Sequence, residues 1–193
     1  MSHAALELVL LNYAFIASLP ALFFRRTGRL RAAWWLTGLH FGGVPACLLL
    51  AAAGWLPGTW TPPAAWQPGL TGLAVAASAA SLVVLAMARG CQRVRLAQWH
   101  MESDAPAEIV TWGPYAWVRH PFYLGYLLAA GAAALLAPGP IMAGWVGYTW
   151  AVLARTARRE ERRLLASALG AEYAPYMART GRFLPGWRRG REP

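Results

Sequence analysis

Long apolar segments separated by clusters of arginine constrain the fold of this chain more than any other feature. Residues 4–24 form a segment of 21 mostly apolar positions, which Arg25 and Arg26 end. At about 1.5 Å of rise per residue, a helix of this length crosses the roughly 30 Å hydrocarbon layer of a membrane. Residues 33–56 and 70–88 have the same character. The chain is therefore expected to place three helices in a membrane before residue 90.

The last apolar stretch, residues 122–154, is interrupted by Pro138-Gly139-Pro140. No continuous helix carries such a sequence, so a helical hairpin is predicted here. Each arm has only about 15 apolar residues, or roughly 22 Å of helix, so helical structure must extend past the apolar part to cross. We expect the second arm to continue through Arg163. The sequence thus predicts an all-α integral membrane protein with five transmembrane helices, the last two forming the hairpin.

The distribution of arginine predicts the orientation. The 18 basic residues are all arginine, and none lies in the two connections expected on one side, residues 57–69 and 138–140. The positive-inside rule then places the amino terminus outside and the carboxyl terminus in the cytoplasm. A net charge of +10 could indicate nucleic acid, but these arginines lie between or after apolar segments, so membrane lipids and no nucleic acid are the predicted partners. The last three, Arg188, Arg189 and Arg191, are expected to meet anionic head groups.

Two segments are longer than the connections of a small membrane protein require. They are residues 90–119 and the tail from Arg155 onward. Residues 1–193 are accordingly read as a single membrane domain, in which residues 1–89 supply three spans and residues 90–193 the catalytic part. Cys47 and Cys91 show neither a disulfide framework nor a metal-ligand spacing, so no metal is expected. His40 is unusual inside an apolar segment, but nearby glycines and Pro45 favour a role in helix packing or a kink.

Counting along the hairpin brings the two polar segments together. His120 lies 18 residues before Pro138, and Glu161 lies 21 residues after Pro140. In antiparallel helices these side chains differ in height by roughly 5 Å. Pro121 is suited to be the first residue of its helix, and Gly170 to cap the end of the following helix. An imidazole, two carboxylates and guanidinium groups are expensive beside hydrocarbon, so this cluster is a functional-site hypothesis.

The motif residues of these segments resemble a known family. The stretch from Gly113-Pro114-Tyr115 through Arg119-His120-Pro121-Phe122-Tyr123-Leu124-Gly125, with Glu160-Glu161 and the residues 170–173, is similar to isoprenylcysteine carboxyl methyltransferases and related phospholipid methyltransferases. The resemblance implies methyl transfer from S-adenosylmethionine, in a cytoplasmic pocket formed by the 90–120 connection and the tail, to a lipophilic or prenylated acceptor. It implies these cofactor-binding residues: Ile109, Val110, Tyr115, His120, Pro121, Phe122, Tyr123, Glu160 and Glu161.

One departure from the family pattern bears on the acceptor. In the carboxyl methyltransferases an arginine one turn before the cofactor-binding glutamate is thought to hold the substrate carboxylate, but Ala157 stands there. Arg155 or Arg158 on the same helix are candidates to replace it. The resemblance makes a carboxylate the leading acceptor, and methylation of a carboxylate needs no general base. A lipid amine or thiol is the alternative, and for an amine His120 or Glu160 would remove the proton.

Two other functions are weighed against methyl transfer. Sterol reductases end in a similar Arg-His-Pro-x-Tyr plus acidic arrangement, so an NADPH-dependent membrane reductase is one alternative. A non-catalytic membrane scaffold is the other, although it would leave the converging polar cluster unexplained. The all-arginine, alanine-rich composition suggests a GC-rich bacterial genome and hence a plasma membrane. The sequence does not specify an oligomeric state.

Overall fold

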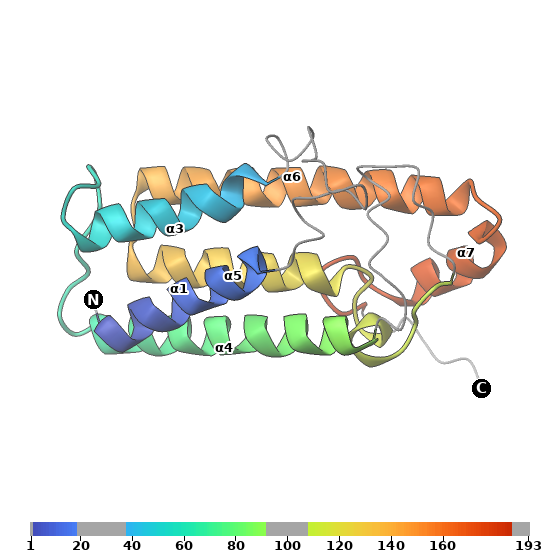
Figure 1. The fold of residues 1–193 in the computed structure, drawn as a ribbon, viewed down its shortest axis with the longest axis horizontal. Helices are drawn as coiled ribbons and strands as arrows, with labels where there is room; N and C mark the ends of the chain where they lie inside the picture. Colours follow the sequence, from blue (N-terminus) through green and yellow to red (C-terminus); the bar gives the residue numbers. More distant parts are fainter. Residues whose placement is uncertain (1, 19–37, 92–107, 187–193) are drawn as a thin grey trace. The chain divides into compact units, whose positions relative to one another are not determined.

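A computed structural model describes residues 2–18, 38–91 and 108–186. Within these ranges the regular structure is helical, with six α-helices, one short 3-10 helix and no strand beyond an isolated bridge (Figure 1). The arginines of residues 25–31 and 188–191, on which the predicted orientation partly rests, lie outside the described residues. The elements are α1 (His3–Ala17), α3 (Leu39–Ala52), α4 (Gln67–Cys91), η2 (Gly113–Ala116), α5 (Pro121–Leu136), α6 (Pro140–Leu165) and α7 (Gly170–Arg179).

The chain divides into two compact units. Unit 1 comprises Met1–Leu82 and Gly125–Val152, and unit 2 comprises Val83–Leu124 and Leu153–Pro193. Helices α4, α5 and α6 each contribute residues to both units, since their bounds cross these limits. The predicted hairpin is confirmed, because α5 ends at Leu136 and α6 begins at Pro140. The predicted extension of the second arm through Arg163 is confirmed as well.

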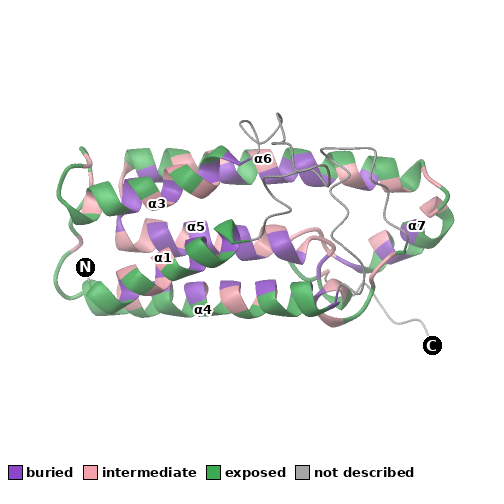
Figure 2. Cartoon of the chain, in the orientation of Figure 1, coloured by how far each residue is buried: buried purple, intermediate pink, exposed green. Residues whose placement is uncertain are grey.

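Small residues and one polar network hold the helices of unit 1 together. Helix α5 is buried largely through alanines, which allow close helix approach (Figure 2). Asn12 of α1 donates from Nδ2 to the carbonyl and hydroxyl oxygens of Ser78, both at 3.2 Å. Ser81 of α4 donates to the carbonyl oxygen of Gly125 at 2.7 Å. These bonds tie α1, α4 and α5 at a fixed register, as interhelical polar contacts do in membranes.

His40 lies at the start of α3 and is almost fully buried. Its ring stands 4.0 Å from that of Phe41, which in turn packs edge-on against Tyr126. Among the residues that the structure describes, neither ring nitrogen has a hydrogen-bond partner. Pro45 lies inside the same helix. These contacts agree with the expected packing role of this residue.

The two connections expected on one side of the membrane are in contact within unit 1. The amide of Trp60 donates to the carbonyl oxygen of Pro138 at 2.7 Å. Gly139 lies so close to the other connection that a Cβ atom there would be 2.7 Å from the carbonyl oxygen of Gly58. Residue 139 therefore has to be glycine for the hairpin tip to pack this closely against residues 53–66, the connection between α3 and α4.

Replacement of Gly139 by alanine should destabilise unit 1. We expect Gly139→Ala to lower the free energy of unfolding by about 1–3 kcal/mol, because backbone atoms must shift to admit the methyl group. Thermal or SDS-induced unfolding in detergent measures this. Gly144→Ala is the control, since a Cβ there meets nothing within 4 Å and alanine favours the helix. Equal stability of the two variants would contradict the packing described.

The outer faces of the unit 1 helices are apolar. Large side chains such as Leu11, Leu49 and Leu73 are exposed, which is the reverse of a helix that faces water. In the described part of the chain, α4 is the one helix long and apolar enough to cross a membrane, while α1, α3 and α5 are apolar but shorter. The structure therefore supports one span by length, and the other four remain predictions.

The expectation that one helix runs to Gly170 is wrong. Helix α6 ends at Leu165, and Gly170 is the first residue of α7. Ser167 ends the helix, because its hydroxyl donates to the carbonyl oxygen of Leu164 at 2.8 Å and accepts from the amide of Leu169 at 3.2 Å. A Cβ at residue 170 would stand 2.3 Å from the carbonyl oxygen of Leu165. The glycine thus serves a tight turn between two helices, and the cap is supplied by serine.

Candidate active site

Backbone pairing between two distant segments of unit 2 positions the beginning of α5. Pro121 is the first residue of the helix, as predicted. Immediately before it, the amide of Arg119 donates to the carbonyl oxygen of Gly181 at 2.8 Å, and that of His120 to the carbonyl oxygen of Arg182 at 3.2 Å. Val118 and Gly181 form an isolated parallel bridge. The segment after α7 is thereby fixed against the segment that carries the histidine.

Glu161 is the centre of a cluster of charges in unit 2. Its Oε1 atom accepts from Arg119 Nε at 2.9 Å and lies 3.3 Å from His120 Nε2. Arg182 donates from Nε to both carboxylate oxygens, at 3.0 and 3.1 Å, and from Nη2 to Oε2. The side chain of Glu161 is only 5% exposed. A carboxylate this buried is tolerable because each of its oxygens accepts bonds from cations.

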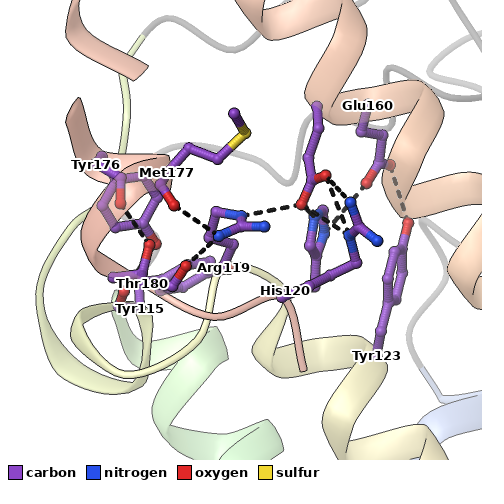
Figure 3. Close-up of polar contacts among 10 residues, drawn as sticks. Tyr115, Arg119, His120, Tyr123, Glu160, Tyr176, Met177 and Thr180 are labelled. Carbon is purple, nitrogen blue, oxygen red and sulfur yellow. Dashed lines mark hydrogen bonds and ion pairs between the residues drawn. The ribbon is translucent and has the colours of Figure 1, made fainter. Parts of the chain in front are cut away.

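Glu160 lies beside an aromatic group (Figure 3). One of its oxygens accepts the hydroxyl of Tyr123 at 2.9 Å, and the other lies 3.5 Å from His120 Nδ1. The rings of His120 and Tyr123 are stacked, with centroids 5.2 Å apart and planes within 3°. Phe183 packs edge-on against both rings. The histidine thus bridges the two glutamates and presents an aromatic face next to them.

Arg119 links the cluster to the chain after α7. Its Nη1 atom donates to the carbonyl oxygen of Met177 at 3.0 Å and to that of Thr180 (Figure 3). Nearby, the hydroxyl of Tyr176 donates to the carbonyl oxygen of Tyr115 at 2.7 Å. Burial raises the pKa of Tyr176 to about 12, so the hydroxyl keeps the proton that it donates. These bonds fasten α7 to the segment from Tyr115 to Arg119.

The surroundings of Glu161 shift its ionisation. Burial by itself would raise the pKa of this carboxyl, but hydrogen bonds from His120, Arg182 and Arg119, together with the charge of Arg119, outweigh burial. The pKa therefore lies well below its ordinary value near 4.5. Glu161 is an anion at neutral pH, and the contacts that hold it ionised also stabilise the fold.

This shift predicts how stability depends on pH. The pKa of Glu161 is lower in the folded than in the unfolded state, so its contribution is present above the unfolded value and is lost as the pH falls below it. We expect the difference in unfolding free energy between wild type and Glu161→Gln to shrink as the pH falls below about 5. Denaturation curves of both proteins at each pH measure it. A difference that stays constant down to pH 3 would contradict the assignment.

The structure brings some of the predicted site residues together and leaves others apart. His120, Tyr123, Glu160 and Glu161 form one connected group. Pro121 and Phe122 are buried in the first turn of α5, and Tyr115 joins through its carbonyl oxygen. Ile109 and Val110 are half-buried and take no part in the polar contacts described above. Arg155 and Arg158 are exposed on α6, whereas Ala157 is fully buried.

Sequence reasoning missed two members of the cluster. Arg119 was expected at the mouth of the helix but not as a partner of Glu161, although its place directly before His120 was a usable signal. Arg182 was one of ten arginines after residue 154, with nothing in its immediate sequence to distinguish it. Its role follows only from the backbone pairing of residues 181 and 182 with residues 119 and 120.

Exposed apolar side chains in unit 1, a helix long enough to cross a membrane, and a buried, cation-held carboxylate beside aromatic rings in unit 2 are typical of a helical membrane protein with a polar site. The model of the isoprenylcysteine carboxyl methyltransferase family matches residues 70–166, which is half of the chain. The chain belongs to this family of membrane-embedded methyltransferases, as the resemblance of its motif residues implied. Comparisons with curated proteins and with solved structures returned no match.

Proposed function

We propose that this protein transfers a methyl group from S-adenosylmethionine to a lipophilic acceptor that reaches the site from the bilayer, and that the methylated group is a carboxylate. The observation that carries the proposal is the group formed by His120, Tyr123, Glu160 and Glu161 in unit 2. These are residues through which family members are expected to bind the cofactor. The family match supplies the reaction class.

The side chains of this group fit the chemistry of the cofactor. S-adenosylmethionine, when bound, supplies a methyl group on a sulfonium, which is an electrophile. The stacked rings of His120 and Tyr123, with Phe183 at their edge, offer aromatic faces of the kind that attract a sulfonium. Glu160 carries a carboxylate, which accepts hydrogen bonds from hydroxyl or ammonium groups, and Glu161 could accept them if one of its present partners gave way. Ile109, Val110, Tyr115, Pro121 and Phe122 would complete the cofactor contacts.

The residues of the chain contribute mainly position and exclusion of water. Methylation of a carboxylate requires no proton transfer, so acceleration comes from alignment of the two reactants and from desolvation of the attacking anion. If the acceptor is instead an amine, His120 or Glu160 would take its proton. A guanidinium near the site would hold an acceptor carboxylate, and Arg155 and Arg158 are candidates from the exposed face of α6.

The proposed spans and their orientation in the membrane are those predicted from the sequence. Residues 1–89 would supply three spans and residues 90–193 the catalytic part with the hairpin. The amino terminus would lie outside a plasma membrane and the site in the cytoplasm, where S-adenosylmethionine is made available.

The proposal is tested by titrating the detergent-purified protein with S-adenosylhomocysteine and, separately, with NADPH. We expect saturable binding of S-adenosylhomocysteine alone. Incubation of membranes with methyl-labelled S-adenosylmethionine should then yield a labelled lipid whose methyl group base treatment releases, as from an ester. Binding of NADPH alone would point to a reductase, and binding of neither ligand would favour a scaffold. A labelled lipid that keeps its methyl group in base would indicate that the acceptor is an amine or a thiol.

A further inference from the structure

The carboxylate of Glu161 has no capacity left for a ligand. A carboxylate accepts about four hydrogen bonds through the lone pairs of its two oxygens. Arg119 and His120 occupy Oε1, and Arg182 lies against both oxygens. If Glu161 is to contact a bound molecule, one of these three partners has to leave.

Arg182 is the partner free to leave. Arg119 is 9% exposed and is held by two carbonyl oxygens besides Glu161, and His120 is 10% exposed and is held by Glu160. The side chain of Arg182 is 34% exposed, and in the described part of the chain its hydrogen bonds go to Glu161 alone. If the Arg182 side chain left Glu161, one ion pair would be lost and no buried cation would be exposed.

The backbone at Arg182 need not move in this exchange. The carbonyl oxygen of Arg182 accepts the amide of His120, and the neighbouring carbonyl of Gly181 accepts that of Arg119. Phe183 is packed against His120 and Tyr123. Since residues 181 and 183 are fixed by these contacts, only the side chain of Arg182 has to rotate.

We propose that Arg182 is the carboxylate-binding group of this site, and that its ion pair with Glu161 opens when a ligand carboxylate takes the place of Glu161. This inference rests on the proposed function. The guanidinium already holds a carboxylate through Nε and Nη2, which is the fork that binds a carboxylate side-on. Arg182 lies beyond the residues that the family model matches, and it supplies a guanidinium at the cluster where Ala157 cannot.

Two carboxylates could occupy this fork. One belongs to the amino-acid end of the cofactor, whose ammonium would then pair with the oxygen of Glu161 that Arg182 releases, so that every charge keeps a partner. The other belongs to a prenylated acceptor. Both ligands present a carboxylate that can bind side-on to the guanidinium of Arg182, and the experiment below distinguishes them.

Binding of four probes to wild type, Arg182→Gln and Arg182→Lys tests the proposal by calorimetry on the full chain. The probes are S-adenosylhomocysteine, 5′-methylthioadenosine, which lacks the amino-acid end, a farnesylated cysteine carboxylate and its amide. If the cofactor carboxylate is the ligand, Arg182→Gln lowers the affinity for S-adenosylhomocysteine by about tenfold or more. The affinity for methylthioadenosine then stays within about twofold of that of wild type. If the acceptor carboxylate is the ligand, the farnesylated acid is weakened and its amide is not. Arg182→Lys keeps the charge but loses the fork, so its effect should be intermediate.

Arg179→Gln is the matched control, because it removes an exposed arginine at the end of α7, three residues before Arg182, and should leave all four affinities unchanged. The helical content and melting temperature of each variant establish that it folds. If Arg182→Gln fails to fold, Arg182→Lys is used in its place. The test is then the ratio of its affinities for each carboxylate-containing probe and for the analogue without that carboxylate. If Arg182→Gln changes the affinity for the two members equally in both pairs, or changes none of the four affinities, the role of Arg182 is overturned and methyl transfer is left intact. Absence of S-adenosylhomocysteine binding to wild type overturns the proposed function and this role together.

Discussion

Glu161→Gln should weaken binding of S-adenosylhomocysteine by about 30-fold to 4000-fold. Glutamine keeps the shape of the side chain but removes the charge on which Arg119, His120 and Arg182 converge. Loss of one member of a buried, hydrogen-bonded charge pair costs about 2–5 kcal/mol, and every 1.4 kcal/mol is a factor of ten in affinity. Methyl transfer to the labelled lipid should fall with it. Calorimetry and initial rates on the purified variant measure the two effects.

The comparison needs a matched charge removal elsewhere. Glu172 lies exposed in the first turn of α7, so Glu172→Gln should bind and react like wild type. Glu161→Asp keeps the charge on a shorter side chain and should fall between wild type and Glu161→Gln. Circular dichroism at the temperature of the binding experiment establishes that each variant is folded. Affinity of Glu161→Gln within about twofold of wild type would remove this carboxylate from the proposed site.

Arg119→Met should destabilise unit 2 by about 3–5 kcal/mol. The arginine donates to Glu161 and to the carbonyl oxygens of Met177 and Thr180, so its loss leaves a buried carboxylate and two carbonyls short of partners. The segment after α7 should then exchange amide hydrogens faster, because Arg119 is one of the residues that fasten it. Denaturation in detergent and hydrogen exchange over residues 177–186 measure these two effects.

Arg162→Met is the control for this substitution. Arg162 is exposed on α6, and its replacement should change the unfolding free energy by no more than about 0.5 kcal/mol. Wild-type stability of Arg119→Met, or faster exchange in Arg162→Met to the same degree, would show that the network around Arg119 does not hold the segment.

The sequence alone was sufficient to predict the hairpin and the meeting of His120 with Glu161. The break at Pro138-Gly139-Pro140 follows from the missing amide and fixed φ of proline. The rise per residue is nearly the same in every α-helix, so counting from the break placed the two side chains at one height. The observed 3.3 Å between His120 Nε2 and Glu161 Oε1 agrees with that count.

The end of α6 could not be predicted from the same rules. Gly170 has the identity of a helix cap, but the helix stops five residues earlier, at Leu165. Hydrogen bonds of the Ser167 side chain compete with the helix there, and serine is common enough in helices that its presence alone is a weak signal.

Local chemistry thus determined where the chain turns back and which two residues meet, because these depend on spacing and on the backbone properties of single residues. The choice of Arg119 and Arg182 as partners of Glu161 was decided by tertiary structure. Arginines have the same charge and reach wherever they stand in a sequence. Only the pairing of residues 181 and 182 with residues 119 and 120 brings one guanidinium from the tail to the carboxylate. Arg155 and Arg158 are exposed on α6.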